Sequence, residues 1–196
     1  MPGLVSPSAL MLLGVNLGVI AAAYVGDWSL PTVLMSYLVQ SVIIGLFQAR
    51  KMADLQRFST EGLKINDHAV DPTPATRRQV VAFFLLHYGI FHAAYIAFVL
   101  SSGAPDWRAL LGSGAMFGAN HLFSYFANRE AASKQVPNIG TMMFAPYIRV
   151  VPMHAFILAG AYFAEGSAGL IAFMLLKTAA DETMHLVEHR TGMEVG

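Results

Sequence analysis

Ionisable side chains are concentrated in the long apolar stretches of this sequence. Six of the seven histidines lie in such stretches, and an ionisable group inside a bilayer is costly enough to indicate a function. Counted along helices that rise about 1.5 Å per residue, five ionisable residues lie about 6–16 Å from the expected cytoplasmic ends. The candidates for one shared polar site are His87, His121, His154, Asp181 and His185.

The residue types of this set favour a transition metal. The chain has no cysteine, and imidazole and carboxylate ligands without thiolate suit Zn²⁺, Fe²⁺ or Cu²⁺ better than Mg²⁺ or Ca²⁺. We expect three or four of the five side chains to bind one ion, and Zn²⁺ is the first expectation. Three protein ligands and a water molecule would make a hydrolytic site, because the metal lowers the pKa of the water and polarises a carbonyl group.

Two further kinds of side chain would complete a hydrolytic site. Glu182 and Asp181 are the candidate catalytic bases, because both lie beside the expected ligands on one helix. Arg149 lies near the expected membrane interface, where a guanidinium could hold an anionic lipid headgroup. The expected substrate is therefore a lipid or another membrane-embedded small molecule.

Supporting roles are expected for three other residues. His92 lies about 140° from His87 around a helix, so the two imidazoles should not bind the same ion. His92 shares a face with Tyr88, which favours a hydrogen-bonded role for both residues. Lys177 precedes Asp181 by four residues, a spacing that allows a local ion pair.

Three alternatives use the same residues. Haem b electron transfer would need axial histidines from two helices, for example His87 and His154. An ion-coupled or proton-coupled transporter would use Lys177, Asp181 and Glu182 as relay groups. The polar residues would otherwise only hold the helices together through ion pairs and hydrogen bonds.

Apolar helices must position these side chains. Hydrophobic residues make up 56% of the 196 residues and charged residues 12%, about half the charged fraction of a soluble domain. The charges cancel, so no basic field favours a nucleic-acid partner. A helix needs about 20 apolar residues to cross a bilayer, which predicts an all-α integral membrane bundle of six helices in a single domain. The six expected spans are 7–25, 30–49, 79–101, 108–127, 143–163 and 167–189.

Basic residues predict the orientation of this bundle. Nine of them lie in the connections 50–78 and 128–142 or at the C-terminal end, whereas Arg108 is alone on the opposite side. Because basic residues mark cytoplasmic loops, both termini and the 50–78 connection are expected in the cytoplasm. The nine are Arg50, Lys51, Arg57, Lys64, Arg77, Arg78, Arg129, Lys134 and Arg190.

Small residues predict which way His121 points. Gly114 and Gly118 have the spacing that lets transmembrane helices approach closely. His121 lies about 20° from Gly114 around the helix, so its ring is expected to face the protein and not the lipid. Pro146 and Pro152 should kink the fifth expected span.

Three segments together resemble a known family. They are the HYGIF sequence at 87–91, the PYIRVVPMH sequence at 146–154 and the KxxxDxxxH pattern at 177–185. The chain resembles an uncharacterised family of small prokaryotic integral membrane proteins, known only as a domain of unknown function. The resemblance implies a polytopic helical protein of a prokaryotic cytoplasmic membrane, and it brings no activity, partner or oligomeric state.

Overall fold

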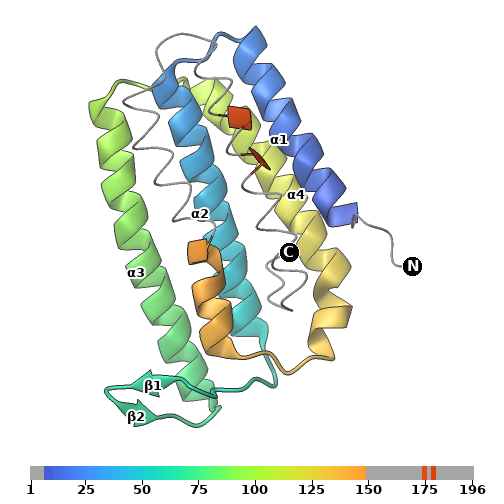
Figure 1. Cartoon of the computed structure of the whole chain (residues 1–196), viewed down its shortest axis with the longest axis vertical. Coiled ribbons are helices and arrows are strands. Elements are labelled where there is room, and N and C mark those ends of the chain that lie inside the picture. Colours follow the sequence, from blue (N-terminus) through green and yellow to red (C-terminus); the bar gives the residue numbers. More distant parts are fainter. Residues whose placement is uncertain (1–6, 149–173, 176–177, 180–196) are drawn as a thin grey trace.

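The chain folds mainly into helices that run antiparallel to their neighbours in sequence (Figure 1). The computed structural model describes residues 7–148, 174–175 and 178–179. Within these residues the predicted helical class is confirmed. The elements are α1 Pro7–Val25, α2 Leu30–Asp54, β1 Lys64–Ile65, β2 His68–Ala69, α3 Pro74–Ser101, α4 Trp107–Ser133 and a shorter apolar helix Ile139–Ile148.

Each of the four long helices begins or ends within one residue of an expected span. α1 coincides with the span 7–25, and α4 starts one residue before the expected 108. α2 continues to Asp54, and α3 begins at Pro74 and not at 79, because helices extend past the apolar stretch where a cap allows it. At α3 the hydroxyl of Thr73 accepts a hydrogen bond from the Thr76 amide, and Pro74 occupies the first turn.

Helix α2 lies at the centre of the described bundle. It contacts α3 on one side and α4 on the other, and α1 packs against α4 (Figure 1). By length and composition, α2 and α3 could each cross a membrane. A bundle of six spans is not established, because most of the expected spans 143–163 and 167–189 lies outside the described residues.

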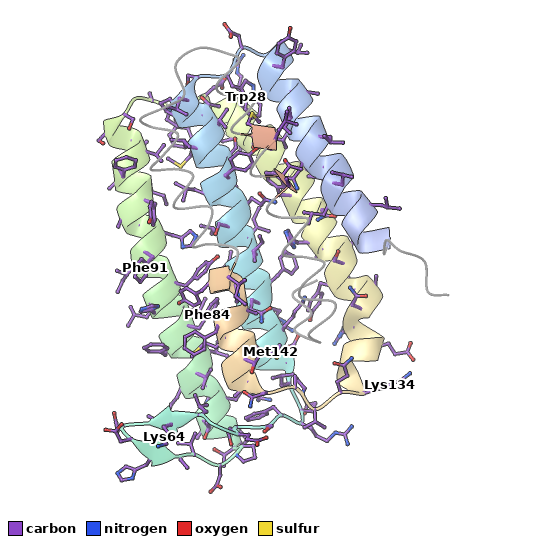
Figure 2. All side chains as sticks on the ribbon, viewed as in Figure 1. Trp28, Lys64, Phe84, Phe91, Lys134 and Met142 are labelled. Carbon is purple, nitrogen blue, oxygen red and sulfur yellow. The ribbon has the colours of Figure 1, made fainter. Side chains whose placement is uncertain are left out.

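Two groups of buried side chains hold the described helices together. One lies where α1, α2 and α4 meet near the 26–29 and 102–106 connections, and it includes Met174. The other lies at the opposite end, where α2, α3 and helix 139–148 meet around Phe84 (Figure 2). Its buried members are Ala49, Met52, Phe58, Val80, Phe84, Tyr88, Ile139 and Met143.

The 50–78 connection is more ordered than a plain loop. Its middle forms the β1–β2 hairpin, with Ile65 opposite His68. Ser59 pairs with the chain at Asn138, since the Ser59 amide donates to the Pro137 carbonyl and the Ile139 amide donates to the Ser59 carbonyl. These backbone hydrogen bonds fix the start of helix 139–148 against the hairpin connection.

Candidate functional site

The structure describes four of the residues singled out from the sequence. His87, Tyr88 and His92 lie on α3, and His121 lies on α4. The other six lie outside the described residues: Arg149, His154, Lys177, Asp181, Glu182 and His185.

His87 connects α3 to helix 139–148. Its Nδ1 lies 2.7 Å from the hydroxyl oxygen of Tyr147. The imidazole stacks on Phe83 at a centroid distance of 5.4 Å and meets Phe91 edge-on at 4.9 Å. The residue is exposed on the surface of the described bundle. Its ring is therefore held at one nitrogen, by the stacked Phe83 and by the edge contact with Phe91, while no hydrogen bond to Nε2 occurs within the described part of the chain.

This contact joins two of the three segments that carry the family resemblance. His87 begins the 87–91 segment, and Tyr147 is the second residue of the 146–154 segment. The Tyr147 ring also meets Tyr88 edge-on at 5.6 Å and Phe84 at 6.2 Å. The sequence did not single out Tyr147 as a site residue. Its place directly after Pro146, in a segment already noted, was the available signal.

Tyr88 and His92 form a buried hydrogen-bonded network with α2. His92 Nδ1 donates to the carbonyl of Tyr88 at 2.8 Å, and its Nε2 lies 2.8 Å from the Ser41 hydroxyl. The Tyr88 hydroxyl donates to the Ser41 carbonyl at 2.9 Å and lies 2.9 Å from the Ser41 hydroxyl. Both ring nitrogens of His92 are engaged, so this imidazole cannot bind a metal without breaking one of these contacts. Sequence reasoning missed Ser41, which looks like an ordinary small residue in an apolar helix.

Gly45 provides the space for the Tyr88 ring. A methyl group built at Gly45 would overlap the Tyr88 ring at Cε1, far inside van der Waals contact. Gly45 lies one turn beyond Ser41 on α2, so the ring and the hydroxyl of Tyr88 both meet this one face. The network and the tight approach together specify how α2 and α3 pack.

His121 lies in a different setting, between α4 and α2. Its ring stacks on Phe47 at a centroid distance of 6.0 Å, and only 4% of the residue is exposed. The inward direction predicted from Gly114 agrees with this burial, and Gly114 itself approaches Val39 of α2 closely. His121 is thus an imidazole in the interior of the bundle.

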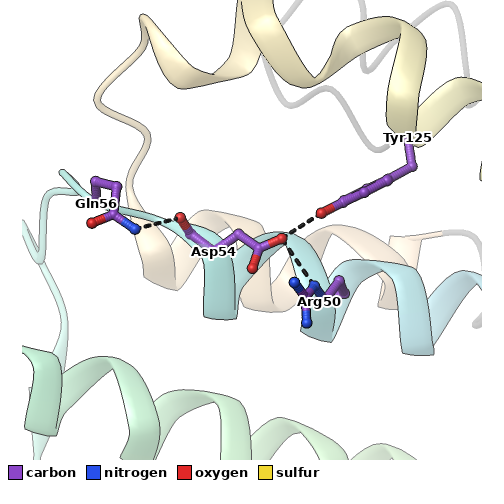
Figure 3. A network of polar contacts seen from close by, with 4 residues as sticks. All are labelled: Arg50, Asp54, Gln56 and Tyr125. Carbon is purple, nitrogen blue, oxygen red and sulfur yellow. Dashed lines mark hydrogen bonds and ion pairs between the residues drawn. The ribbon is translucent and has the colours of Figure 1, made fainter.

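A polar network lies one turn further along the same interface (Figure 3). The Asp54 carboxylate accepts hydrogen bonds from Tyr125 of α4 and from Arg50, the latter at 3.0 Å. Gln56 donates to the carbonyl of Asp54. The Phe47 ring contacts Tyr125 as well as His121, so the network and the histidine share one aromatic neighbour.

The two candidate metal ligands that the structure describes, His87 and His121, lie in two different places. α2 separates α3 from α4 (Figure 1), so His87 and His121 stand on helices on its opposite sides. Within residues 7–148 and the four described residues beyond, no three of His, Asp and Glu are grouped so that they could hold a metal ion. A complete ligand set therefore depends on residues outside the described part of the chain.

Comparison with known proteins gives a family. The model of a family of unknown function (DUF6498) matches residues 3–194, nearly the whole chain. Neither a curated protein nor a solved structure matches the sequence.

Proposed function

The chain belongs to this family of unknown function, and from its own geometry we propose that it is an integral protein of a prokaryotic cytoplasmic membrane. In this proposal six helices span the bilayer and both termini are cytoplasmic. The polar residues inside the bundle bind a transition metal, with zinc as the first candidate. The bound metal would serve hydrolysis of a lipid or another membrane-embedded substrate.

The apolar surface of α3 and α4 is the observation that carries the membrane assignment. Large apolar side chains stand exposed along both helices, whereas soluble monomers rarely expose apolar patches beyond a few hundred Å². In a bilayer the same side chains would face lipid at no cost. They include Phe83, Leu86, Ile90, Phe91 and Leu100 on α3 and Leu111, Leu122, Phe123 and Phe126 on α4.

Polar residues at the two ends of the bundle support the orientation. The hairpin connection and the start of α3 carry Arg57, Lys64 and Arg78, all exposed. At the opposite end Trp107 is exposed beside the short 102–106 connection. Basic residues favour the cytoplasmic side, and exposed tryptophan is typical of a membrane interface.

Because the chain has no cysteine, single-cysteine labelling can test this topology without background. Ala69→Cys lies in β2 and Ala104→Cys in the opposite connection, and both positions are exposed. With a membrane-impermeant maleimide on spheroplasts, we expect labelling at 104 at once and at 69 only after permeabilisation. Labelling of 69 in intact spheroplasts, or recovery of the protein in the soluble fraction, would contradict the proposal.

The metal site is proposed from the donor set. Its ligands would be three or four of His87, His121, His154, Asp181 and His185. The burial of His121 supports a ligand from α4. On α3, His87 has no hydrogen bond at Nε2 within the described residues, which leaves that nitrogen as the candidate ligand atom. Imidazole and carboxylate donors fit Zn²⁺.

The other polar residues would act around the metal. Glu182 or Asp181 would serve as the catalytic base. Arg149 and Lys177 would hold the substrate, and Tyr88 with His92 would support the fold of the site.

Elemental analysis and an absorption spectrum of the purified protein test the metal proposal. We expect stoichiometric zinc, reduced by His87→Ala or by His121→Ala, according to which of the two histidines belongs to the site, and unchanged by His68→Ala. His68 is the matched control, because it lies exposed on the β2 strand. A Soret band would replace the zinc site by haem b. Absence of any metal would leave ion transport, or a purely structural role of the polar residues, as the alternatives.

A further inference from the structure

The two arginines in the first turns of α3 have different surroundings. Arg77 donates to the Leu55 carbonyl and so fastens the 50–78 connection to the helix. Arg78 is exposed, and within residues 7–148, 174–175 and 178–179 it forms no ion pair. The fold therefore uses Arg77, whereas the charge of Arg78 is presented to the surroundings of the bundle.

Apolar side chains continue from Arg78 along the same face of α3. At 100° per residue, Leu85, Leu86 and Ile96 lie within about 80° of Arg78 around the helix, and they are 43%, 66% and 36% exposed. The last turn of α3 has no basic residue, and the whole helix has no acidic one. The exposed face is thus apolar with a cation at one end, which is the complement of an acyl chain that ends in a phosphate.

Lys64 is a second exposed cation at this end of the bundle (Figure 2). It follows Leu63, which packs against the buried cluster around Phe84, and Val80 of α3 belongs to the same cluster. The chain beside Lys64 and the chain beside Arg78 are therefore anchored to one group of side chains. Both cations are held at the same end of the described helices.

The acidic residues nearby lie on the connection and not on α3. Asp67 is in the turn of the hairpin, Asp71 comes three residues before the helix, and Glu61 precedes β1. Asp54 accepts hydrogen bonds from Arg50 and Tyr125. Because α3 has no acidic residue, the charge that borders its apolar face is positive.

We propose that this end of α3 binds an anionic phospholipid, with the headgroup phosphate at Arg78 and an acyl chain along the apolar face. The inference rests on the membrane part of the proposed function and needs no metal. A guanidinium presents several N–H donors in a plane and suits phosphate oxygens. Apolar contact alone accepts any lipid, whereas each cation near the membrane surface favours an anionic lipid by about 5-fold in affinity.

Fluorescence quenching by labelled lipids measures which phospholipid occupies this face. Because the chain has no cysteine, Leu86→Cys provides one attachment point for a fluorophore. Ile96→Cys provides a second on the same face, about 27 Å from Arg78 along the axis. Each labelled protein is placed in phosphatidylcholine vesicles that contain nitroxide-labelled phosphatidylglycerol or nitroxide-labelled phosphatidylcholine. At position 86 we expect phosphatidylglycerol to bind about 5-fold or more in excess of phosphatidylcholine, and at position 96 we expect equal binding.

Variants of the cation test the role of Arg78. Arg78→Gln should lower the preference for phosphatidylglycerol at position 86 by about 5-fold, whereas Arg78→Lys should retain a clear preference because the charge is kept. Lys134→Gln is the matched control, since Lys134 is also exposed but directly follows α4. It should leave the preference unchanged.

The outcomes separate this inference from the membrane assignment. Equal binding of the two lipids at position 86, or a preference that survives Arg78→Gln, would overturn the inference and leave α3 in the membrane. Absence of quenching by either lipid at both positions would mean that α3 does not face lipid, and would overturn both.

A last arm distinguishes a lipid from free phosphate. Inorganic phosphate, added at constant ionic strength, should not change the quenching by phosphatidylglycerol at position 86, because the acyl chain contributes to binding. Displacement of the labelled lipid by inorganic phosphate would mean that the surface takes the free anion, and would overturn the assignment to a phospholipid.

Discussion

Two imidazoles on one helix, His87 and His92, have opposite surroundings. His92 is 3% exposed, stacks on Tyr88 at 4.2 Å and has partners at both ring nitrogens. His87 is exposed and has one nitrogen held by Tyr147. Five residues of separation rotate them by about 140° around the helix axis. One face of α3 therefore uses histidine to pack against α2. On another face the histidine has a hydrogen bond at only one ring nitrogen within residues 7–148, 174–175 and 178–179.

This difference shows that residue type does not identify a site inside an apolar bundle. A buried polar group must find hydrogen-bond partners, whatever else it does. An imidazole with both nitrogens engaged has met that requirement and is explained by packing. An imidazole oriented through one nitrogen only is the one that can still bind a ligand.

The largest expected effect comes from Tyr88, on the packed face. Tyr88→Ala removes a buried ring and its hydroxyl, and we expect the free energy of unfolding to fall by about 3–5 kcal/mol. His87→Ala removes an exposed ring with one hydrogen bond to Tyr147, and we expect a loss of about 1 kcal/mol. Reversible unfolding in mixed micelles, followed by circular dichroism, measures both. Equal losses of unfolding free energy in the two variants would contradict the distinction between the packed face of α3, with Tyr88, and the exposed face, with His87.

A matched pair of glycines tests the same packed face. Gly45→Ala places a methyl group into the Tyr88 ring, and we expect a loss of about 1–3 kcal/mol from overpacking. Gly89 follows Tyr88 on α3, and among the described residues outside its own turn of helix no atom lies within 4 Å of a methyl group built there. Gly89→Ala should change stability by less than about 1 kcal/mol, in the stabilising direction. A neutral Gly45→Ala would show that the ring can move aside.

The hydroxyl of Ser41 contributes the next effect. Ser41→Ala removes the hydroxyl that lies 2.8 Å from His92 Nε2 and 2.9 Å from the Tyr88 hydroxyl, whereas the Ser41 carbonyl still accepts from Tyr88. We expect a loss of about 1–3 kcal/mol, because these contacts are buried. Ser101→Ala is the control, since that hydroxyl is exposed and donates to the Phe98 carbonyl of its own helix near the end of α3. Its loss should be within about 0.5 kcal/mol. Similar values for both variants would mean that the buried network adds nothing specific.

The sequence predicted what depends on local signals. The long apolar stretches predicted the four long helices to within one residue at one end or both, and the glycine spacing on α4 correctly predicted the burial of His121. The pairing of Ser59 with Asn138 was not predictable, because neither segment has a residue pattern that indicates the other as its partner. Ser41 and Tyr147 were missed for the same reason, because only the packing of two helices gives their hydroxyls a role. The residues expected on the sixth span stay predictions.

The smallest effect is expected where polar partners meet water. Arg50 and Asp54 form an ion pair one turn apart at the end of α2, and their side chains are 65% and 33% exposed. Arg50→Gln should lower the free energy of unfolding by only about 0.3–0.5 kcal/mol, and the loss should shrink in high salt because exposed charges are screened. Tyr125 still donates to Asp54 in this variant, so the carboxylate keeps a partner. A loss as large as that of Ser41→Ala, and unchanged by salt, would mean that the Asp54 network is as well shielded from water as the network around His92. Burial would then no longer distinguish polar groups that stabilise the fold from those that can bind a ligand.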